Sequence, residues 1–202
     1  MLVFCMDQVN DELLVDKTHT DRNAMGKFPF VRILQRYLIP NWIAAIYYSL
    51  RYRCLVSTQA RVQLSDRISF GRGTVVKPFA ILQTQTGRIA IGRECAIGSF
   101  NHISTGEKDV RIGNYVRTGP NVTILGGSRN FQKRDVLIIH QGSHHKSVII
   151  GDDVLIGAGC VILPGSIIGS GVVIGAGSVV NSELPAFAIV AGSPARILGE
   201  RQ

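Results

Sequence analysis

The chain has 202 residues, of which 46% are hydrophobic and 18% are charged, a balance that excludes a globally disordered protein. Glycine is frequent (22 residues) and aromatic residues are sparse (7%), which predicts many tight turns and thin layers. The net charge of +8 favours an anionic ligand or an anionic surface. Because the sequence has neither zinc-finger spacing nor a basic strand studded with aromatic residues, we expect no nucleic-acid partner.

The cysteines and the first residues bear on the compartment. Four cysteines are scattered along the chain, at positions 5, 54, 95 and 160, and no pair has the spacing of a metal site or a disulfide scaffold. The opening stretch MLVFCMDQVNDELL lacks the basic start and long apolar run of a secretory signal. We therefore expect a cytoplasmic protein.

Residues 1–54 are predicted to form a polar tail followed by a helical segment. The apolar part from Tyr37 to Leu50 is too short to span a bilayer and contains Pro40. Arginines flank the aromatic residues of this segment on both sides. Two interpretations stay open: helices that pack on the main domain or a neighbouring subunit, and an interfacial helix pair that brings the protein to the inner face of a membrane.

A repeat of six residues begins near Val56 and is clearest in the second half of the chain. There an aliphatic residue recurs at Ile150, Ile156, Ile162, Ile168, Ile174 and Val180, and Gly or Asn follows five of the six. This period is neither that of a helix nor that of simple strand alternation. It indicates one inward aliphatic side chain per unit followed by a turn, so that three units close a triangular coil and stacked coils bury the aliphatics.

The repeat and the ending AGSPAR (Ala191 to Arg196) resemble the hexapeptide-repeat acyltransferases, in particular the branch that O-acetylates sugars in capsule, O-antigen and colanic acid. The resemblance implies an all-β fold, a left-handed parallel β-helix over residues 55–190. A protruding loop is expected at about residues 126–149 and a C-terminal tail at 191–202. It also implies acetyl-CoA as co-substrate, a sugar or polysaccharide acceptor, and a homotrimer with sites between subunits.

The resemblance further suggests which residues hold the donor. Backbone at Ala158 and Ala176 would contact the pantetheine arm, while Asn181, Ser182 and Arg196 would lie near the adenosine and phosphate end. Coil packing alone explains the two alanines equally well. The sequence also departs from the family, which often has Lys at the position of Ser182 and Trp at the position of Leu155.

Acetylation of a hydroxyl needs a general base, and the family places a histidine where the repeat exits into the loop. In this chain the aligned stretch reads Ser128-Arg129-Asn130-Phe131, so Arg129 occupies the position of the base. Arginine stays protonated and cannot act as a base, but it can hold an anion on the acceptor or a developing oxyanion. The alternative is an ordinary surface arginine.

Three loop histidines, His140, His144 and His145, are the candidates to replace the missing base, although each can equally be a solvent-exposed side chain. We expect His102, on the coil before the loop, to be solvated. His102, His140 and His145 also suggest a zinc site, since the related β-helix carbonic anhydrases bind zinc between subunits through three histidines. Those enzymes place a ligand in the hexapeptide after the loop, where this chain has Asp152, so no metal is expected.

These observations predict an acetyl-CoA-dependent O-acetyltransferase acting on a sugar of a surface polysaccharide or its precursor. The alternative is a catalytically degenerate β-helix relative that serves as a scaffold or binds glycans. The two differ in whether a base is present.

Overall fold

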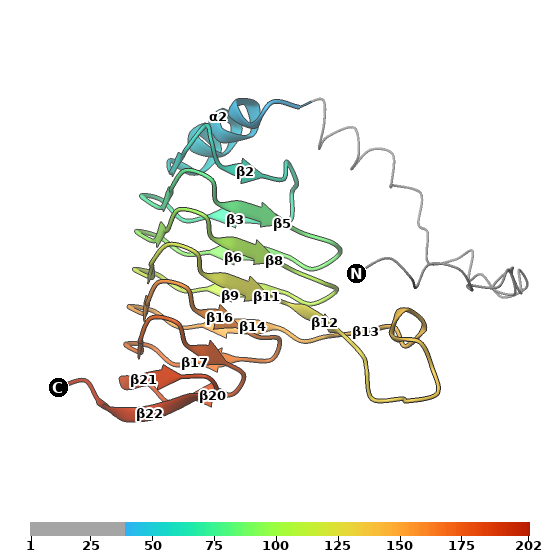
Figure 1. The fold of residues 1–202 in the computed structure, drawn as a ribbon. Coiled ribbons are helices and arrows are strands. Elements are labelled where there is room, and N and C mark those ends of the chain that lie inside the picture. Colours follow the sequence, from blue (N-terminus) through green and yellow to red (C-terminus); the bar gives the residue numbers. More distant parts are fainter. Residues whose placement is uncertain (1–38) are drawn as a thin grey trace, which may run out of the picture.

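The computed structural model describes residues 39–202, which form one helix and a stack of triangular coils (Figure 1). The helix, α2 (Asn41–Tyr52), begins directly after Pro40 and ends at Arg53, whose backbone is left-handed. Its Ala44, Ala45 and Tyr48 are buried against the first coil. The part of the predicted helical segment before residue 39 lies outside the described residues. No helix within residues 39–202 is both long and apolar enough to cross a bilayer.

Each coil contributes one short parallel strand to each of three faces, called A, B and C here. Face A contains β1 (Leu55–Val56), β4 (Val75–Val76), β7 (Ala96–Ile97), β10 (Arg117–Thr118), β15 (Leu155–Ile156), β18 (Val173–Ile174) and β21 (Ala188–Gly192). Face B contains β2 (Arg61–Val62), β5 (Ile81–Gln83), β8 (His102–Ser104), β11 (Thr123–Leu125), β16 (Val161–Ile162) and β19 (Val179–Val180). Face C contains β3 (Ile68–Phe70), β6 (Ile89–Ile91), β9 (Val110–Ile112), β14 (Val148–Ile150), β17 (Ile167–Ile168) and β20 (Glu183–Leu184).

The hexapeptide aliphatics line the inside of the stack, as the repeat predicts. Ile156, Ile162 and Ile174 are fully buried, and each lies in register with its equivalents in the neighbouring coils, as in Thr118↔Ile156↔Ile174 on face A. Because a one-residue slip would turn every aliphatic outward, this column fixes the register of the strands. The predicted left-handed parallel β-helix is confirmed.

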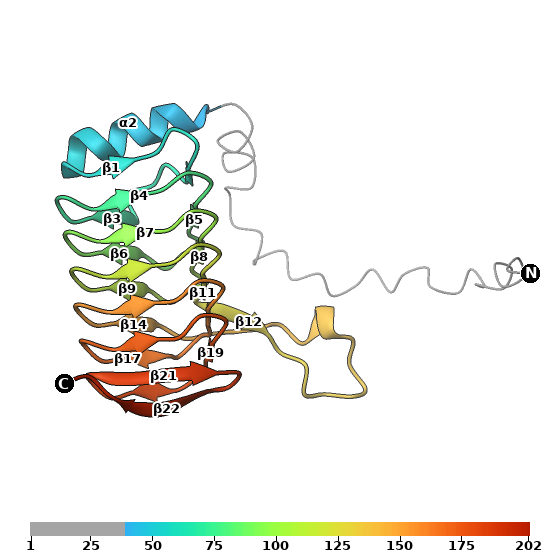
Figure 2. The same cartoon turned by 60° about the vertical axis from the view of Figure 1, so that its left-hand side comes forward.

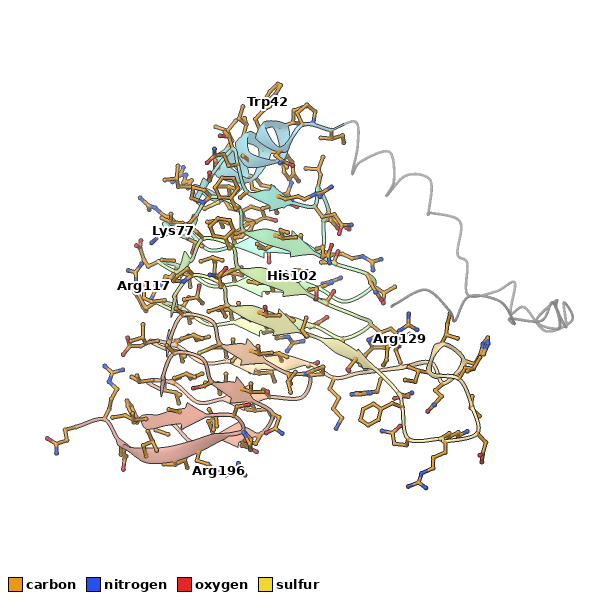
Figure 3. The ribbon with its side chains drawn as sticks, viewed as in Figure 1. Trp42, Lys77, His102, Arg117, Arg129 and Arg196 are labelled. Atoms are coloured by element: carbon orange, nitrogen blue, oxygen red, sulfur yellow. The ribbon has the colours of Figure 1, made fainter. Side chains whose placement is uncertain are left out.

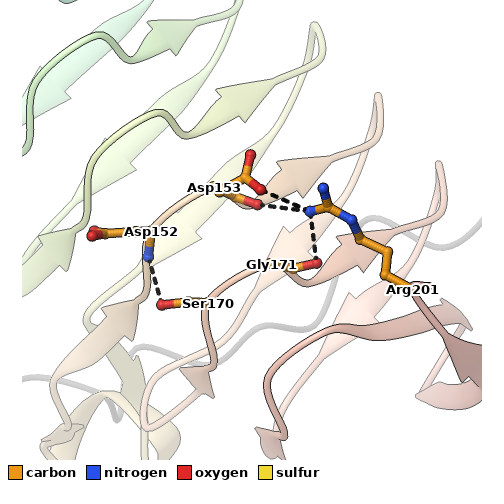
Figure 4. A network of polar contacts seen from close by, with 5 residues as sticks. All are labelled: Asp152, Asp153, Ser170, Gly171 and Arg201. Atoms are coloured by element: carbon orange, nitrogen blue, oxygen red, sulfur yellow. Dashed lines mark hydrogen bonds and ion pairs between the residues drawn. The ribbon is translucent and has the colours of Figure 1, made fainter.

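The C-terminal segment 191–202, predicted as a tail, instead forms a further strand. β22 (Ala195–Glu200) pairs antiparallel with β21 and closes the lower end of the stack. Arg201, directly after β22, joins the C-terminal segment to the preceding coils. Its Nη1 donates to Asp153 Oδ2 at 2.9 Å and to the Gly171 carbonyl at 3.1 Å (Figure 4). The repeat does not reach this strand, which pairs through backbone hydrogen bonds that any sequence can form.

One long excursion leaves the stack between β11 and β14 and projects from its side (Figure 2). It starts as an antiparallel hairpin of β12 (Gly127–Arg129) and β13 (Ser143–His145), and it carries a single 3₁₀ turn, η1 (Ile138–His140). Side-chain amides hold it together: Asn130 Nδ2 donates to the Gln141 carbonyl at 3.0 Å, and Gln141 Nε2 donates to the carbonyls of Lys133 and Val136.

Candidate functional site

A groove of about 820 Å³ runs over the upper part of face B. Its floor is the outer surface of β2, β5 and β8, and its walls are the N-terminal end of α2 and the hairpin of β12 and β13. Outward side chains alternate with buried ones along each strand, so Arg61, Gln63, Gln83, His102 and Ser104 line the floor. The coil geometry thus gathers polar residues that are about 20 positions apart in the sequence, the length of one coil.

His102 lies on the floor of this groove (Figure 3). It is half-buried, and its Nε2 lies 3.0 Å from the side-chain nitrogen of Gln83 one coil above. The register Ile81↔His102↔Thr123 places it between an aliphatic and a hydroxyl side chain. The sequence favours a solvated side chain at this position over a catalytic one. The signal for an outward position on a strand was its place next to inward Ile103.

Arg129 and His145 enter the groove from the hairpin. The pairs Gly127↔His145 and Arg129↔Ser143 set both side chains on the groove wall. The His145 ring lies against Gly106, since a Cβ on that glycine would be 1.8 Å from Nδ1. This Nδ1 is buried and has no hydrogen-bond partner. Only a residue without a side chain at position 106 leaves room for the imidazole.

His144 and His140 lie elsewhere. His144 follows the opposite side of β13, because neighbouring residues of a strand point to opposite faces. Its Nδ1 lies 2.9 Å from Asn130 Oδ1, so it joins β12 to β13. His140 ends the exposed turn η1 at the far part of the excursion and does not line the groove. Of the three loop histidines, the groove therefore receives only His145.

The groove has a cationic lining. Arg61 and Arg129 contribute full positive charges, and no Asp or Glu is among the described residues that line it. Such a surface favours a ligand that carries phosphate or carboxylate.

The buried cysteines of the stack are poor candidates for thiol chemistry. Burial raises the pKa of Cys95 and of Cys160 and keeps both thiols protonated.

Ala158 and Ala176 occupy the corner that joins face A to face B, one directly above the other. Both are exposed, and the Gly177 amide donates to the Ala158 carbonyl at 2.8 Å. The following residues, Gly159 and Gly177, have φ of +68° and +70°, and a Cβ built on either would meet nothing within 4 Å. This open track of exposed backbone, bordered by small residues, leaves the peptide groups accessible to an extended ligand.

The other residues expected near the donor divide between two corners. Arg196 is exposed on β22 and pairs with Ala191, which lies one coil below Gly175 and so continues the track of small residues. Asn181 and Ser182 lie at the next corner, between β19 and β20 on faces B and C. Within one chain, only Arg196 shares an edge of the stack with Ala158 and Ala176.

Residues 39–202 contain no group of three His, Cys, Asp or Glu side chains placed to hold a metal ion. Asp152, the position considered for a zinc ligand, lies at a corner between faces C and A. Its Oδ1 accepts a hydrogen bond from the Asn114 amide at 2.7 Å, and this bond is the main reason why its pKa is lowered. Asp152 therefore joins two coils.

Comparison with known proteins supports the fold and the enzyme class. Residues 147–182 match the bacterial transferase hexapeptide (six repeats) family. The dTDP-4-amino-4,6-dideoxy-D-glucose acyltransferase of Escherichia coli is 30% identical over 151 residues, which are 72% of this chain and 78% of that protein. The chain belongs to the hexapeptide-repeat acyltransferases. The predicted enzyme class, an acyl-CoA-dependent acyltransferase, is thereby confirmed.

A second curated member of this acyltransferase family matches only locally. The 2,3,4,5-tetrahydropyridine-2,6-dicarboxylate N-acetyltransferase of Halalkalibacterium halodurans is 58% identical over 55 residues, 27% of this chain and 23% of that protein.

Solved structures show the same fold. AntD, an N-acyltransferase from Bacillus cereus in complex with dTDP and 3-hydroxybutyryl-CoA, has a TM-score of 0.67 at 24% identity, covering 74% of this chain and 81% of its own. PerB from Caulobacter crescentus, in complex with CoA and GDP-perosamine, has a TM-score of 0.55 at 25% identity, covering 72% and 57%.

Proposed function

We propose that this acyltransferase transfers an acyl group from acyl-CoA to the amino group of a nucleotide-linked sugar. The observation that carries the proposal is the groove on face B, in which Arg61 and Arg129 stand beside His102 and His145 with no acidic residue among the described lining. Sugar phosphates supply the negative charge that such a lining favours. The Escherichia coli relative is named for a dTDP-linked amino sugar, and PerB was crystallised with GDP-perosamine.

The residue at the usual base position favours an amino group as the acceptor. A hydroxyl is a weak nucleophile and depends on a base, whereas a neutral amine attacks a thioester without further activation. Arg129 is compatible with an amine, from which one proton must still be removed. His102 and His145, which share the groove, are the groups that would accept it. The O-acetylation of a polysaccharide sugar predicted from the sequence stays as the second candidate, because the same imidazoles could activate a hydroxyl.

In the proposed acyl transfer, one set of residues holds the acceptor and another holds the donor. The acceptor nitrogen attacks the thioester carbonyl, the C–S bond breaks, and the amine proton finally resides on the departing CoA thiol. The arginines would hold the acceptor phosphates and thereby fix its amino group. On the donor side, backbone at Ala158 and Ala176 would hold the pantetheine arm, with Arg196 at the CoA phosphates. Asn181 and Ser182 would join this donor site only if a neighbouring subunit brings their corner alongside.

We also propose a trimer, as the exposed aliphatic side chains of the lower coils support. Leu155 on face A and Ile149 and Ile167 on face C are each about 40–50% exposed on otherwise flat surfaces. Burying such side chains between subunits is favourable, at roughly 25 cal/mol per Å². Light scattering should give three times the chain mass. A stable monomer at micromolar concentration would contradict both the trimer and a donor site shared between subunits.

A thiol-release assay tests the function. The purified protein would be given acetyl-CoA with three acceptors in turn: a dTDP-linked 4-amino sugar, its 4-hydroxy counterpart, and free polysaccharide sugars. We expect CoA release with the amino sugar at a rate at least tenfold above the others. Faster release with hydroxyl acceptors would establish O-acetylation instead. CoA binding without transfer to any acceptor would support the degenerate scaffold.

A further inference from the structure

The outer surface of α2 is apolar where a surface helix is normally polar. Five large side chains face solvent: Trp42 (53% exposed), Ile43 (38%), Ile46 (49%), Tyr47 (37%) and Leu50 (78%). Their spacing of three and four residues places Ile43, Ile46, Tyr47 and Leu50 on one stripe of the helix. Burial of the helix in its own domain uses the opposite stripe, so the exposed stripe has no partner within residues 39–202.

This surface is rigidly presented. The inner stripe of α2 is anchored by Tyr48, which is fully buried and whose hydroxyl oxygen lies 2.8 and 2.9 Å from the carbonyl oxygens of Gln63 and Ser65, the two acceptors for its single hydrogen. Burial raises the pKa of Tyr48 to about 12, so this hydroxyl stays protonated. Its ring packs edge-on against Phe70. The helix therefore cannot rotate to bury its outer stripe without losing these contacts.

The charged residues of α2 and of its C-terminal flank are arginines. From Asn41 to Ser65 the sequence has no Asp or Glu, and Arg51 and Arg53 stand at the C-terminal end of the helix. The Arg51 guanidinium lies over the rings of Tyr47 and Tyr52, at 5.8 and 5.5 Å from their centroids. An aliphatic stripe with Trp and Tyr near its border and arginines beside it is typical of helices that lie in the interface of an anionic membrane.

The position of α2 fits a flat partner. The helix lies across the end of the stack, with Trp42 pointing away from the coils (Figures 2 and 3). Twelve residues give a helix about 18 Å long and about 10 Å wide. Its exposed stripe supplies only part of the roughly 800 Å² that each partner of a stable protein interface buries. A stripe of this size and composition suits shallow insertion at a lipid interface.

We propose that α2 docks this acyltransferase on the surface of an anionic lipid bilayer, through Trp42, Ile43, Ile46 and Leu50 with Arg51 and Arg53 at the headgroups. The groove on face B opens beside the first turn of α2, since Pro40, Asn41 and Ala44 line it. Docking would therefore hold the mouth of the groove close to the lipid surface. Docking through α2 does not depend on which acceptor the groove binds.

Flotation of the full-length chain with vesicles tests this inference. We expect binding to vesicles of phosphatidylcholine and phosphatidylserine at 3:1, and much weaker binding to phosphatidylcholine alone. Leu50→Glu should lower the partition coefficient at least tenfold. Arg51→Gln and Arg53→Gln should each lower it about fivefold, with the difference shrinking at high salt. The matched control is Leu198→Glu, which is similarly exposed (69%, against 78% for Leu50) but lies at the opposite end of the stack and should bind like the wild type.

Three outcomes would overturn the proposal. They are a wild type that stays unbound to anionic vesicles, a Leu50→Glu variant that binds as well as the wild type, and a Leu198→Glu variant that loses as much binding as Leu50→Glu. Light scattering of the same variants identifies the other occupant: if Leu50→Glu converts a larger assembly into a smaller one, the stripe is a contact between subunits. Thermal unfolding of each variant confirms that it folds.

Discussion

The coil stack and the excursion between β11 and β14 are held together by different forces. In the stack, strands bond to neighbours above and below, and a column of buried aliphatics fixes their register. In the excursion every residue from 131 to 140 is exposed, and the amides of Asn130 and Gln141 supply side-chain hydrogen bonds that hold it together. Stability is thus concentrated in the stack, while the excursion places Arg129 and His145 at the groove. Substitutions in the stack should therefore lower stability, and substitutions of the groove residues should lower activity.

The largest difference is expected in stability. Leu82 is fully buried in the second coil, whereas Leu137 in the excursion is 67% exposed. Leu82→Ala should lower the free energy of unfolding by about 3 kcal/mol, because it leaves a cavity in a packed core. Leu137→Ala should lower it by less than about 0.5 kcal/mol. Urea unfolding at one fixed protein concentration measures both. Similar losses would mean that the excursion is part of the cooperative core.

Activity should depend on the residues that line the groove, including one supplied by the excursion. If the groove is the acceptor site, His102→Ala and His145→Ala should each lower kcat about 100-fold, the scale of a lost general base. His140→Ala should change kcat less than about twofold, because that side chain is outside the groove. Steady-state kinetics with saturating acyl-CoA separates kcat from KM. Full activity of both groove variants would remove the imidazoles from the mechanism.

Gly106 connects the two regions. A Cβ at this position would lie 1.8 Å from His145 Nδ1, so Gly106→Ala should displace the imidazole and lower kcat about tenfold. Gly199→Ala is the matched control, since a Cβ there meets nothing within 4 Å. The displaced ring should also alter the NMR signal of His145. Unchanged kinetics for Gly106→Ala would show that the position of His145 is not critical.

Donor binding should depend on the stack alone. Arg196→Ala should weaken CoA binding about fivefold at low salt, and less at high salt, where the charge-assisted contact is already screened. Calorimetry with CoA measures the affinity. Arg134→Ala is the control, an exposed arginine in the excursion. Equal affinities of wild type and Arg196→Ala at low salt would exclude Arg196 from the donor site.

The smallest effect concerns acid stability. The Asn114 amide lowers the pKa of Asp152 below its usual 3.8, so the folded state favours the carboxylate. The resulting stabilisation is present above the unfolded pKa and is lost as the pH falls through the lowered folded value. Between about pH 5 and pH 2 the melting temperature of the wild type should therefore fall more steeply than that of Asp152→Asn. Parallel curves would show that this corner contributes nothing to pH dependence.

The sequence by itself determined the repeat, and with it the fold. A period of six with Ile at 150, 156, 162, 168 and 174 is compatible with few folds. Each coil has the same local structure, and the strands of neighbouring coils must pair in the same register. It also located the stretch at which the repeat is interrupted, because this is a local feature of residues adjacent in the chain. The assignment of Arg129 to the position of the usual base rests on the family resemblance and stays a prediction.

Only the tertiary structure decided which side chains share the groove. His102 and Arg61 both line it because they lie on the same face two coils apart, and His145 joins them because the hairpin register sends it inward and His144 outward. The pairing of β22 with β21 and the exposed stripe of α2 depend in the same way on which surfaces are already covered. These outcomes are set by contacts between segments distant in sequence, whose strength depends on geometry and burial, and a linear pattern does not record either.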